Sequence, residues 1–230
     1  MPKTTLMFGS IGAVVETSDI QRRAYNTAMQ EAGLNWHWEP EIYADLLRQA
    51  GGKERLAHLA AATGTALSQD QIDQIHARKT EIAATEVAAR RVALRPGVMD
   101  LVELAKARGM KLSFVTTTFK PNIEAIFKAT GNTLSADSFD VIITRDDVQR
   151  GKPAPDAYKR ALAMLGVSPQ HAVAIEDTAN SVMAAKRAGI AVIATPGELT
   201  ADQDLWQADL VLSSLATGSG VDRRVLEMLD

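Results

Sequence analysis

The sequence predicts an α/β protein in which a parallel sheet flanked by helices carries an inserted all-helical segment. From about residue 97 onward, short β-branched runs alternate with helical patterns, which is typical of a parallel sheet covered on both faces. The segment from about 17 to 93 is rich in Ala, Gln, Glu, Arg and Leu and has no convincing strand pattern. A strand-like run, TLMF, precedes this segment, so the helical part is expected to interrupt the sheet after its first strand.

Short apolar runs bounded by polar segments predict the strands. We expect strands at 5–8, 111–116, 139–144, 172–176, 190–195 and 210–213. Helical patterns are expected at 97–108, 121–131, 155–166, 179–188 and 220–229. The segments ARG and KRAG place a cation in the last turn and a glycine after it, which suits the ends of two of these helices.

The inserted segment is expected to form several helices. They are predicted at 17–32, 40–49, 53–63 and 69–90. Ser68, followed by Gln71, predicts a capping box at the start of the last one. The run ALRPG is the expected return hinge, because proline restricts its own φ and the residue before it. The predicted organisation is a core of residues 1–16 and 94–230 with a helical cap of residues 17–93.

Composition favours a folded protein that binds small molecules or proteins. Of the 230 residues, 46% are apolar, which is enough for a sizeable core. A net charge of -3 gives no basic footprint, so neither nucleic acid nor a membrane surface is an expected partner. The absence of cysteine excludes disulfides, thiolate zinc sites and a cysteine nucleophile. With no signal-peptide pattern and no apolar run of roughly 18 residues, a cytoplasmic location is expected.

Polar residues follow three separate predicted strands, where parallel sheets place their ligand sites. They are Thr116 in SFVTTT, Lys152 in QRGKPAPDAY, and the pair Glu176 and Asp177 in AVAIEDTANS. A hydroxyl and a lysine suit phosphate oxygens, and carboxylates suit a hard cation. Asp177 alone would also fit the N-cap of a helix. We favour the ligand site because Thr116 and Lys152 follow the neighbouring predicted strands.

In this order and spacing, the set resembles the haloacid dehalogenase (HAD) superfamily, in the branch of β-phosphoglucomutase and the CbbY-like sugar-phosphate phosphatases. The resemblance covers essentially the whole chain, and it is strongest in GKPAPDAY together with AIEDTANSVMAAKRAG. It implies a Rossmann-like core with a helical cap and Mg²⁺-dependent phosphate chemistry. Thr116 and Lys152 would bind phosphate, with Thr117 beside them, and Asp177 and Glu176 would hold the metal.

The first loop departs from the family pattern. Members of the family carry D-x-D-G-T-L there, with a nucleophilic aspartate and an acid/base aspartate. This chain has Gly9 and Ile11 at those two positions, and Gln21 stands where the sugar-phosphate branch usually carries a histidine. Ser10 is the only hydroxyl in the loop, and side-chain alternation predicts that it points away from the face of positions 9 and 11. We therefore assign no catalytic residue to this loop.

The groups that would bind a phosphate anion are nevertheless expected to be present. Losing two aspartates and one divalent cation hardly changes the formal charge of the pocket. The backbone N–H groups of the turn through Ser10 and Gly12 can form an anion-binding concavity beside Thr116 and Lys152. Mg²⁺ is implied by the resemblance, but the loss of one carboxylate at Gly9 disfavours it.

The cap supplies further cations that the resemblance places near the distal part of a substrate. Lys53 and Arg55 follow a diglycine turn, Lys79 lies on the longest predicted cap helix, and Gln21 joins them. For Lys79, a solvated surface charge is an equally good interpretation. The resulting hypothesis is a phosphatase-like protein that binds a sugar phosphate but cleaves it poorly. Two alternatives stay open: an active hydrolase with a non-standard nucleophile, and a protein-interaction module whose pocket Ile11 plugs.

Overall fold

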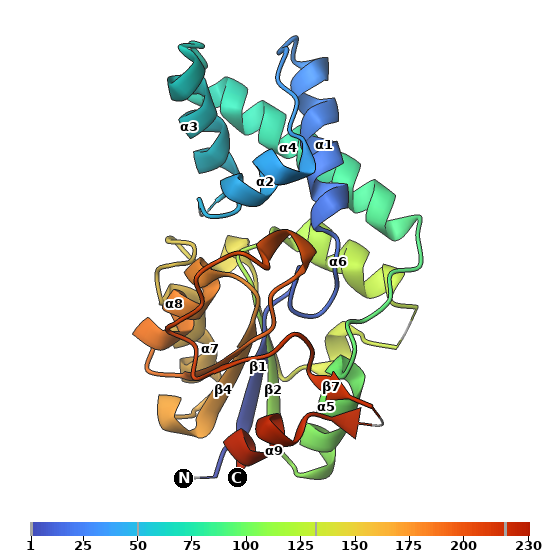
Figure 1. Cartoon of the computed structure of the whole chain (residues 1–230), viewed down its shortest axis with the longest axis vertical. Coiled ribbons are helices and arrows are strands. Elements are labelled where there is room, and N and C mark those ends of the chain that lie inside the picture. The colour runs from blue at the N-terminus through green and yellow to red at the C-terminus, as the bar shows by residue number, and fades with distance from the viewer. Residues whose placement is uncertain (1, 50, 132, 219) are drawn as a thin grey trace.

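A six-stranded parallel sheet forms the centre of the molecule in the computed structural model, which describes residues 2–49, 51–131, 133–218 and 220–230 (Figure 1). The strand order is β3-β2-β1-β4-β5-β6, and every neighbouring pair is parallel. The strands are β1 (Thr5–Phe8), β2 (Lys111–Val115), β3 (Val141–Ile143), β4 (Ala172–Glu176), β5 (Ala191–Ala194) and β6 (Leu210–Val211). The predicted α/β class is confirmed.

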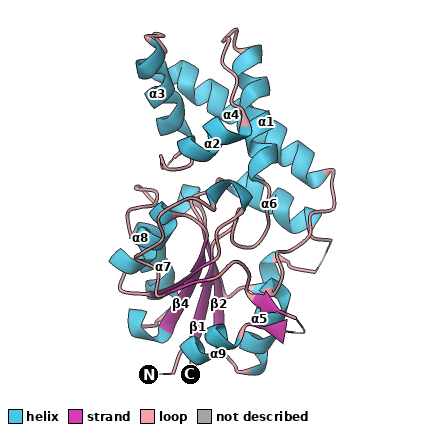
Figure 2. Ribbon diagram, viewed as in Figure 1, coloured by secondary structure: helices cyan, strands magenta, loops and turns pink. Residues whose placement is uncertain are grey.

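Helices cover both faces of this sheet (Figure 2). They are α5 (Val98–Ala107), α6 (Lys120–Ala129), α7 (Asp156–Leu165), α8 (Ala179–Arg187) and α9 (Arg223–Leu229). Short 3-10 turns span Ala136–Ser138, Arg145–Asp147, Pro169–His171 and Glu198–Thr200. The helix predicted at 220–229 is shorter than expected, because Gly220 and Val221 form β8, which pairs antiparallel with β7 (Ala216–Thr217).

The central strand shows why the sheet must be covered on both sides. All four residues of β1 are fully buried. Leu6 and Phe8 pack into one apolar cluster with α5, α6 and α9, whereas Met7 packs into the other with α7 and α8. This two-residue alternation is the geometry of a β-strand, and burial on both faces explains the continuously apolar run TLMF.

The helices of the inserted segment lie beyond the carboxyl ends of the strands, at the top of Figure 1. They are α1 (Ser18–Glu31), α2 (Pro40–Leu46), α3 (Gly52–Thr63) and α4 (Gln69–Ala88). Tyr25, Trp38 and Tyr43 form the centre of their apolar cluster. The predicted capping box is confirmed, because Ser68 Oγ accepts from Gln71 N and Gln71 Oε1 accepts from Ser68 N.

The two segments that connect these helices to the sheet run together. Val15 and Leu94 form an isolated antiparallel bridge, and Arg95 N donates to Val14 O at 2.8 Å. The pairing lies next to the predicted boundaries at 16 and 94, and the division into core and cap stays a prediction. We refer to α1–α4 as the cap helices.

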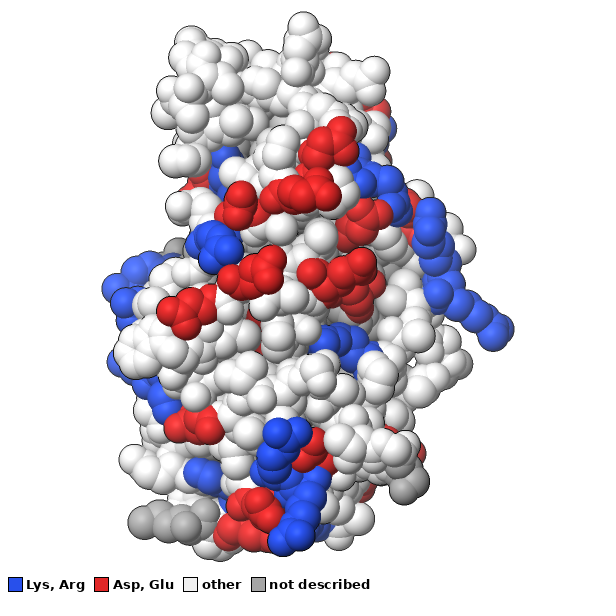
Figure 3. Space-filling model, viewed as in Figure 1, with Lys and Arg blue, Asp and Glu red and all other residues white. Residues whose placement is uncertain are grey.

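Acidic and basic side chains are interspersed on the face of the molecule shown in Figure 3. This mixture agrees with the nearly balanced count of 25 basic and 28 acidic residues. Within the described ranges, every helix is too short or too polar to cross a membrane.

Candidate functional site

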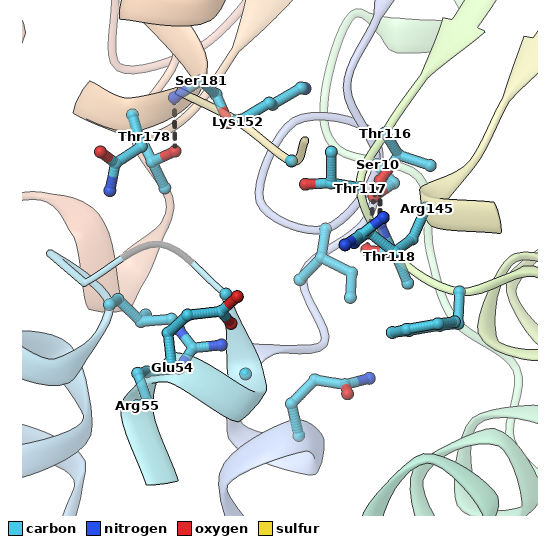
Figure 4. Close-up of a pocket in the computed structure, with 18 of the residues that line it drawn as sticks. Ser10, Glu54, Arg55, Thr116, Thr117, Thr118, Arg145, Lys152, Thr178 and Ser181 are labelled. Carbon is cyan, nitrogen blue, oxygen red and sulfur yellow. Dashed lines mark hydrogen bonds between the residues drawn. The ribbon is translucent and has the colours of Figure 1, made fainter. Parts of the chain in front are cut away.

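A cavity of about 480 Å³ lies between the cap helices and the carboxyl ends of the strands (Figure 4). Its core side is lined by Ser10 after β1, Thr116 after β2, Lys152 after β3 and Glu176 at the end of β4. These side chains converge because parallel strands all end at the same edge of the sheet. The sequence-predicted site residues Ile11, Gln21, Lys53, Arg55, Lys79, Thr117 and Asp177 line the same cavity.

Hydroxyl groups form one wall of this cavity. Ser10 Oγ lies 2.8 Å from Thr116 Oγ1 and 3.4 Å from Thr118 Oγ1. Thr118 N donates to Thr116 Oγ1 at 3.0 Å, which fixes the orientation of that hydroxyl. We predicted that Ser10 points away from the face of positions 9 and 11, but Ser10 and Ile11 line the same cavity. Strand β1 ends at Phe8, so the alternation of an extended strand does not continue into the turn that carries Ser10.

The space beside Gly9 is filled by the carboxylate of Glu176. A Cβ atom at Gly9 would lie 2.5 Å from Glu176 Oε2 and 3.2 Å from Ala13 Cβ, both closer than ordinary contacts. Glu176 is 1% exposed, and its Oε1 accepts hydrogen bonds from Lys152 Nζ and Tyr158 Oη. A residue with a side chain at position 9 would therefore displace the buried Glu176.

Lys152 is held in place but keeps donor capacity. Its ammonium group donates to Glu176 and, at 2.9 Å, to the backbone oxygen of Val115. An ammonium has three protons, so one remains for an anion in the cavity. Tyr158 is a further residue of the site that the sequence analysis did not single out. Its hydrogen bond to Glu176 was missed because nothing in the sequence distinguishes it from the other buried tyrosines.

Asp177 lies against Gly12 at the edge of the cavity. The space where a Cβ of residue 12 would stand is taken by Asp177 Oδ2, and Gly12 has a φ of 82°, so two reasons favour glycine there. Burial first, and then the neighbouring carboxylates of Glu176 and Glu16, raise the pKa of Asp177 well above its usual value.

Arg95 is a structural residue of the site that the sequence analysis missed. Its guanidinium donates to the backbone oxygens of Gly12 and Thr195 and, at 2.8 Å, to that of Pro196. It therefore ties the first loop to the loop after β5. Arg95 belongs to the predicted hinge ALRPG, but the proline was the reason for that prediction and nothing in the sequence indicated the partners of the arginine.

Arg145 is a second cation that the sequence analysis did not assign to the site. It lines the cavity beside Thr118 (Figure 4). Arg145 N donates to Thr118 O at 3.1 Å, and its guanidinium donates to Val148 O at 2.6 Å. The 3-10 turn that carries Arg145 follows β3. The position of Arg145 just after a predicted strand was the sequence signal that could have assigned it to the site.

The described residues are a poor fit for a magnesium ion held by protein ligands. None of them form a group of three or more His, Cys, Asp or Glu side chains that could hold a metal. Glu176 Oε1 is already bound by Lys152 and Tyr158, so at the cavity this carboxylate offers only Oε2, with Asp177 beside it. Mg²⁺ usually takes one or two carboxylates together with phosphate oxygens and water. Gly9 has no carboxylate to add to this set.

The cap side of the cavity contains the buried Lys79 and the half-buried Arg55. Lys79 is 7% exposed, so its interpretation as a solvated surface charge was wrong. Its Nζ donates to Gln21 Oε1 and lies 4.6 Å from the centroid of the Tyr25 ring. The guanidinium carbon of Arg55 lies 5.7 Å from the Tyr43 ring centroid, and its buried Nε has no hydrogen-bond partner within the described ranges.

Lys53 and His76 also line the cap side of the cavity, but neither offers a free positive charge to a ligand. Lys53 Nζ pairs with Asp73 at 2.8 Å, and both side chains are partly exposed. His76 contacts the ring of Phe119 across the cavity, with 5.4 Å between centroids. Burial, followed by the nearby cations, lowers the pKa of His76 to about 3, so its ring is neutral.

Comparisons with known proteins agree with this geometry. The sequence model of the haloacid dehalogenase-like hydrolases matches residues 5–189. The chain is 37% identical to protein CbbY of Rhodobacter capsulatus over 219 residues, covering 95% of this chain and 96% of that protein. It is 32% identical to the validoxylamine A 7'-phosphate phosphatase of Streptomyces hygroscopicus subsp. limoneus, covering 91% and 92%.

Solved structures extend the comparison. A crystal structure of CbbY from Rhodobacter sphaeroides in complex with phosphate has a TM-score of 0.89 and 38% identity, with 100% of both chains covered. A variant of the same protein in complex with xylulose-1,5-bisphosphate gives the same values. Hydrolases of this family generally use Mg²⁺. The extent of these matches confirms the predicted likeness to CbbY, and the chain belongs to the haloacid dehalogenase-like hydrolase family.

Proposed function

We propose that the cavity binds a phosphorylated sugar without requiring metal and that the chain cleaves it poorly. The observation that carries this proposal is the arrangement around Gly9. The neighbouring carboxylate Glu176 occupies the space of a side chain at position 9, while the hydroxyl and ammonium donors around it remain directed at the cavity.

The donors suit a phosphate group. Ser10, Thr116 and Thr117 supply hydroxyls, and Lys152 supplies a charged donor that is already oriented by Val115 and Glu176. Hydrogen bonds that involve an ionised partner are roughly twice as strong as neutral ones, so Lys152 is expected to contribute the most. The complexes of the similar CbbY with phosphate and with a sugar bisphosphate support the same ligand class.

The cap side is suited to a second anionic group. Arg55 is a half-buried cation that forms no ion pair with a carboxylate of the described residues, and it lines the cavity together with the Lys79 amine. A cation partly removed from water without a counter-ion is costly, and an anionic ligand would relieve that cost. A sugar with phosphates at both ends would use the core side and the cap side together.

Poor cleavage follows from the first loop. Neither Gly9 nor Ile11 has a group that could attack phosphorus or protonate a leaving oxygen. Removing a nucleophile from a hydrolase lowers kcat by about 10⁶ in a well-studied case, and only the effect of the binding groups is left. We therefore expect binding without ordinary turnover.

Isothermal titration calorimetry in excess EDTA tests the binding. Inorganic phosphate and xylulose-1,5-bisphosphate are both expected to bind, the bisphosphate more tightly. Thr116→Val is expected to weaken both about tenfold, since one lost hydrogen bond is worth about 1.4 kcal/mol. Arg55→Met is expected to weaken the bisphosphate only. Thr85→Val, on an exposed position of α4, is the matched control. No heat with either ligand would refute the proposal.

An active hydrolase with a non-standard nucleophile is the second candidate function, and the position of the Glu176 carboxylate favours it. Glu176 Oε2 lies where a side chain of residue 9 would begin, so it is the carboxylate closest to the vacated position. A panel of phosphomonoesters with Mg²⁺ separates the two candidates. Turnover that disappears in Asp177→Ala would favour the active hydrolase. The plugged interaction module is disfavoured, because Ile11 lines the cavity and leaves about 480 Å³ open.

A further inference from the structure

Lys79 differs from the other lysines that line the cavity. Lys53 pairs with Asp73 and Lys152 pairs with Glu176, whereas Lys79 forms no ion pair within the described ranges. Its Nζ instead donates to the amide oxygen of Gln21 and faces the ring of Tyr25. The amine thus lies at the wall of a ligand-sized cavity without a carboxylate to keep it protonated.

The surroundings favour the neutral amine. Burial first, and then the charge of Arg55, lower the pKa of Lys79 to about 7. The groups that face it are Gln21 and Tyr25 on α1, Arg55 on α3 and the neutral His76 on its own helix. A neutral amine has two protons and one lone pair. One proton is used by Gln21, the other can face the Tyr25 ring, and the lone pair is left for an electrophile.

We propose that Lys79 is a carbonyl-binding amine that forms a reversible imine with the open-chain aldehyde or ketone of a phosphorylated sugar. The proposal rests on the proposed function, because the phosphate of that sugar would lie at the core side of the same cavity, near Ser10, Thr116 and Lys152. It narrows the ligand class to sugar phosphates with a free carbonyl group.

The chemistry needs no further reactant. The Lys79 nitrogen attacks the carbonyl carbon, a C–N bond forms, and the carbonyl π electrons move to oxygen, which takes a proton from the nitrogen. The C–O bond then breaks, the oxygen leaves as water with a second proton from the nitrogen, and the nitrogen lone pair forms the C=N bond. A primary amine and a carbonyl give an imine and one water. Buried lysines with lowered pKa values are well suited to this reaction.

Reductive trapping tests the proposal directly. The wild-type protein is incubated with sodium cyanoborohydride and either dihydroxyacetone phosphate or xylulose 5-phosphate, digested, and analysed by peptide mass spectrometry. We expect about tenfold or more adduct on Lys79 than on Lys53 or Lys152, because those two amines are held in ion pairs with Asp73 and Glu176 and the Lys79 amine is not. The trapping rate at Lys79 is expected to rise to half its maximum near pH 7. An adduct yield that simply follows lysine exposure, greatest on residues such as the 69% exposed Lys120, would overturn the proposal.

Controls separate this inference from the proposed function. Lys106→Arg, an exposed change on α5, is expected to leave the Lys79 adduct unchanged, and Lys79→Arg is expected to abolish it. Glycerol 3-phosphate, which has no carbonyl, is expected to protect Lys79 by occupying the phosphate site. If calorimetry detects phosphate binding but Lys79 is not trapped, only the imine is refuted. If unphosphorylated dihydroxyacetone traps Lys79 as well as the phosphorylated ketone does, the imine stands and the phosphate site is refuted.

Discussion

Introducing an acid at Gly9 is expected to destabilise the protein. The new Cβ would lie 2.5 Å from Glu176 Oε2, so the buried carboxylate must move by about 1 Å to reach an ordinary contact of about 3.5 Å. Overpacking of this kind costs about 1–3 kcal/mol. A second carboxylate beside Glu176 adds about 1–3 kcal/mol, because it is buried without its own donor.

The expected loss for Gly9→Asp is therefore about 2–6 kcal/mol of the free energy of unfolding, a large part of the roughly 5–15 kcal/mol typical of folded proteins. Urea denaturation at pH 7.5 in EDTA measures it. With a slope of about 2 kcal/mol per molar urea, the midpoint should fall by about 1–3 M. Gly220→Asp is the control, since a Cβ there meets nothing within 4 Å, and its effect should stay within about 0.5 kcal/mol.

A double substitution tests whether Glu176 causes the destabilisation by Gly9→Asp. Adding Glu176→Ala to Gly9→Asp removes the side chain with which the new acid collides, so the two changes should be coupled by at least about 1 kcal/mol. If Gly9→Asp is as stable as Gly220→Asp, or if the two changes are additive, Glu176 does not fill the space beside Gly9 and the reasoning fails.

Three further predictions concern stability. Tyr158→Phe removes one donor from the buried Glu176 carboxylate and should cost about 1.5–3 kcal/mol in urea denaturation. Ser68→Ala removes the capping box of α4 and should cost about 1 kcal/mol, whereas a change below about 0.2 kcal/mol would contradict the cap. Because the folded state lowers the pKa of Lys79 from 10.5 to about 7, the unfolded chain binds the extra proton between these values, and stability gains on the order of 3 kcal/mol as pH rises from 7 to 9.5. In Lys79→Met this part of the pH dependence should be absent, and an unchanged difference between the two pH values would contradict the buried amine.

Much of the fold could be predicted from the sequence, because burial on both faces of a parallel sheet leaves a pattern that is local in the chain. The run at β1 matched its predicted bounds of 5–8, and β4 matched 172–176. The last helix was predicted too long, since the pattern at 220–229 does not reveal that Gly220 and Val221 pair with a neighbouring strand. Pairing depends on a partner elsewhere in the chain, and a local pattern contains no information about it.

The sequence by itself determined which chemical groups the chain has and which it lacks: hydroxyls, a lysine and carboxylates after the strands, and no acid at Gly9 or Ile11. Only the tertiary structure decided where those groups point. Ser10 turns toward Thr116 because its strand has already ended, and Glu176 occupies the space beside Gly9 because Lys152 and Tyr158 hold it there. Lys79 is buried because α1, α3 and α4 pack around it. Residue types are fixed by the chain, but burial, pKa and vacant space depend on contacts between segments far apart in the sequence.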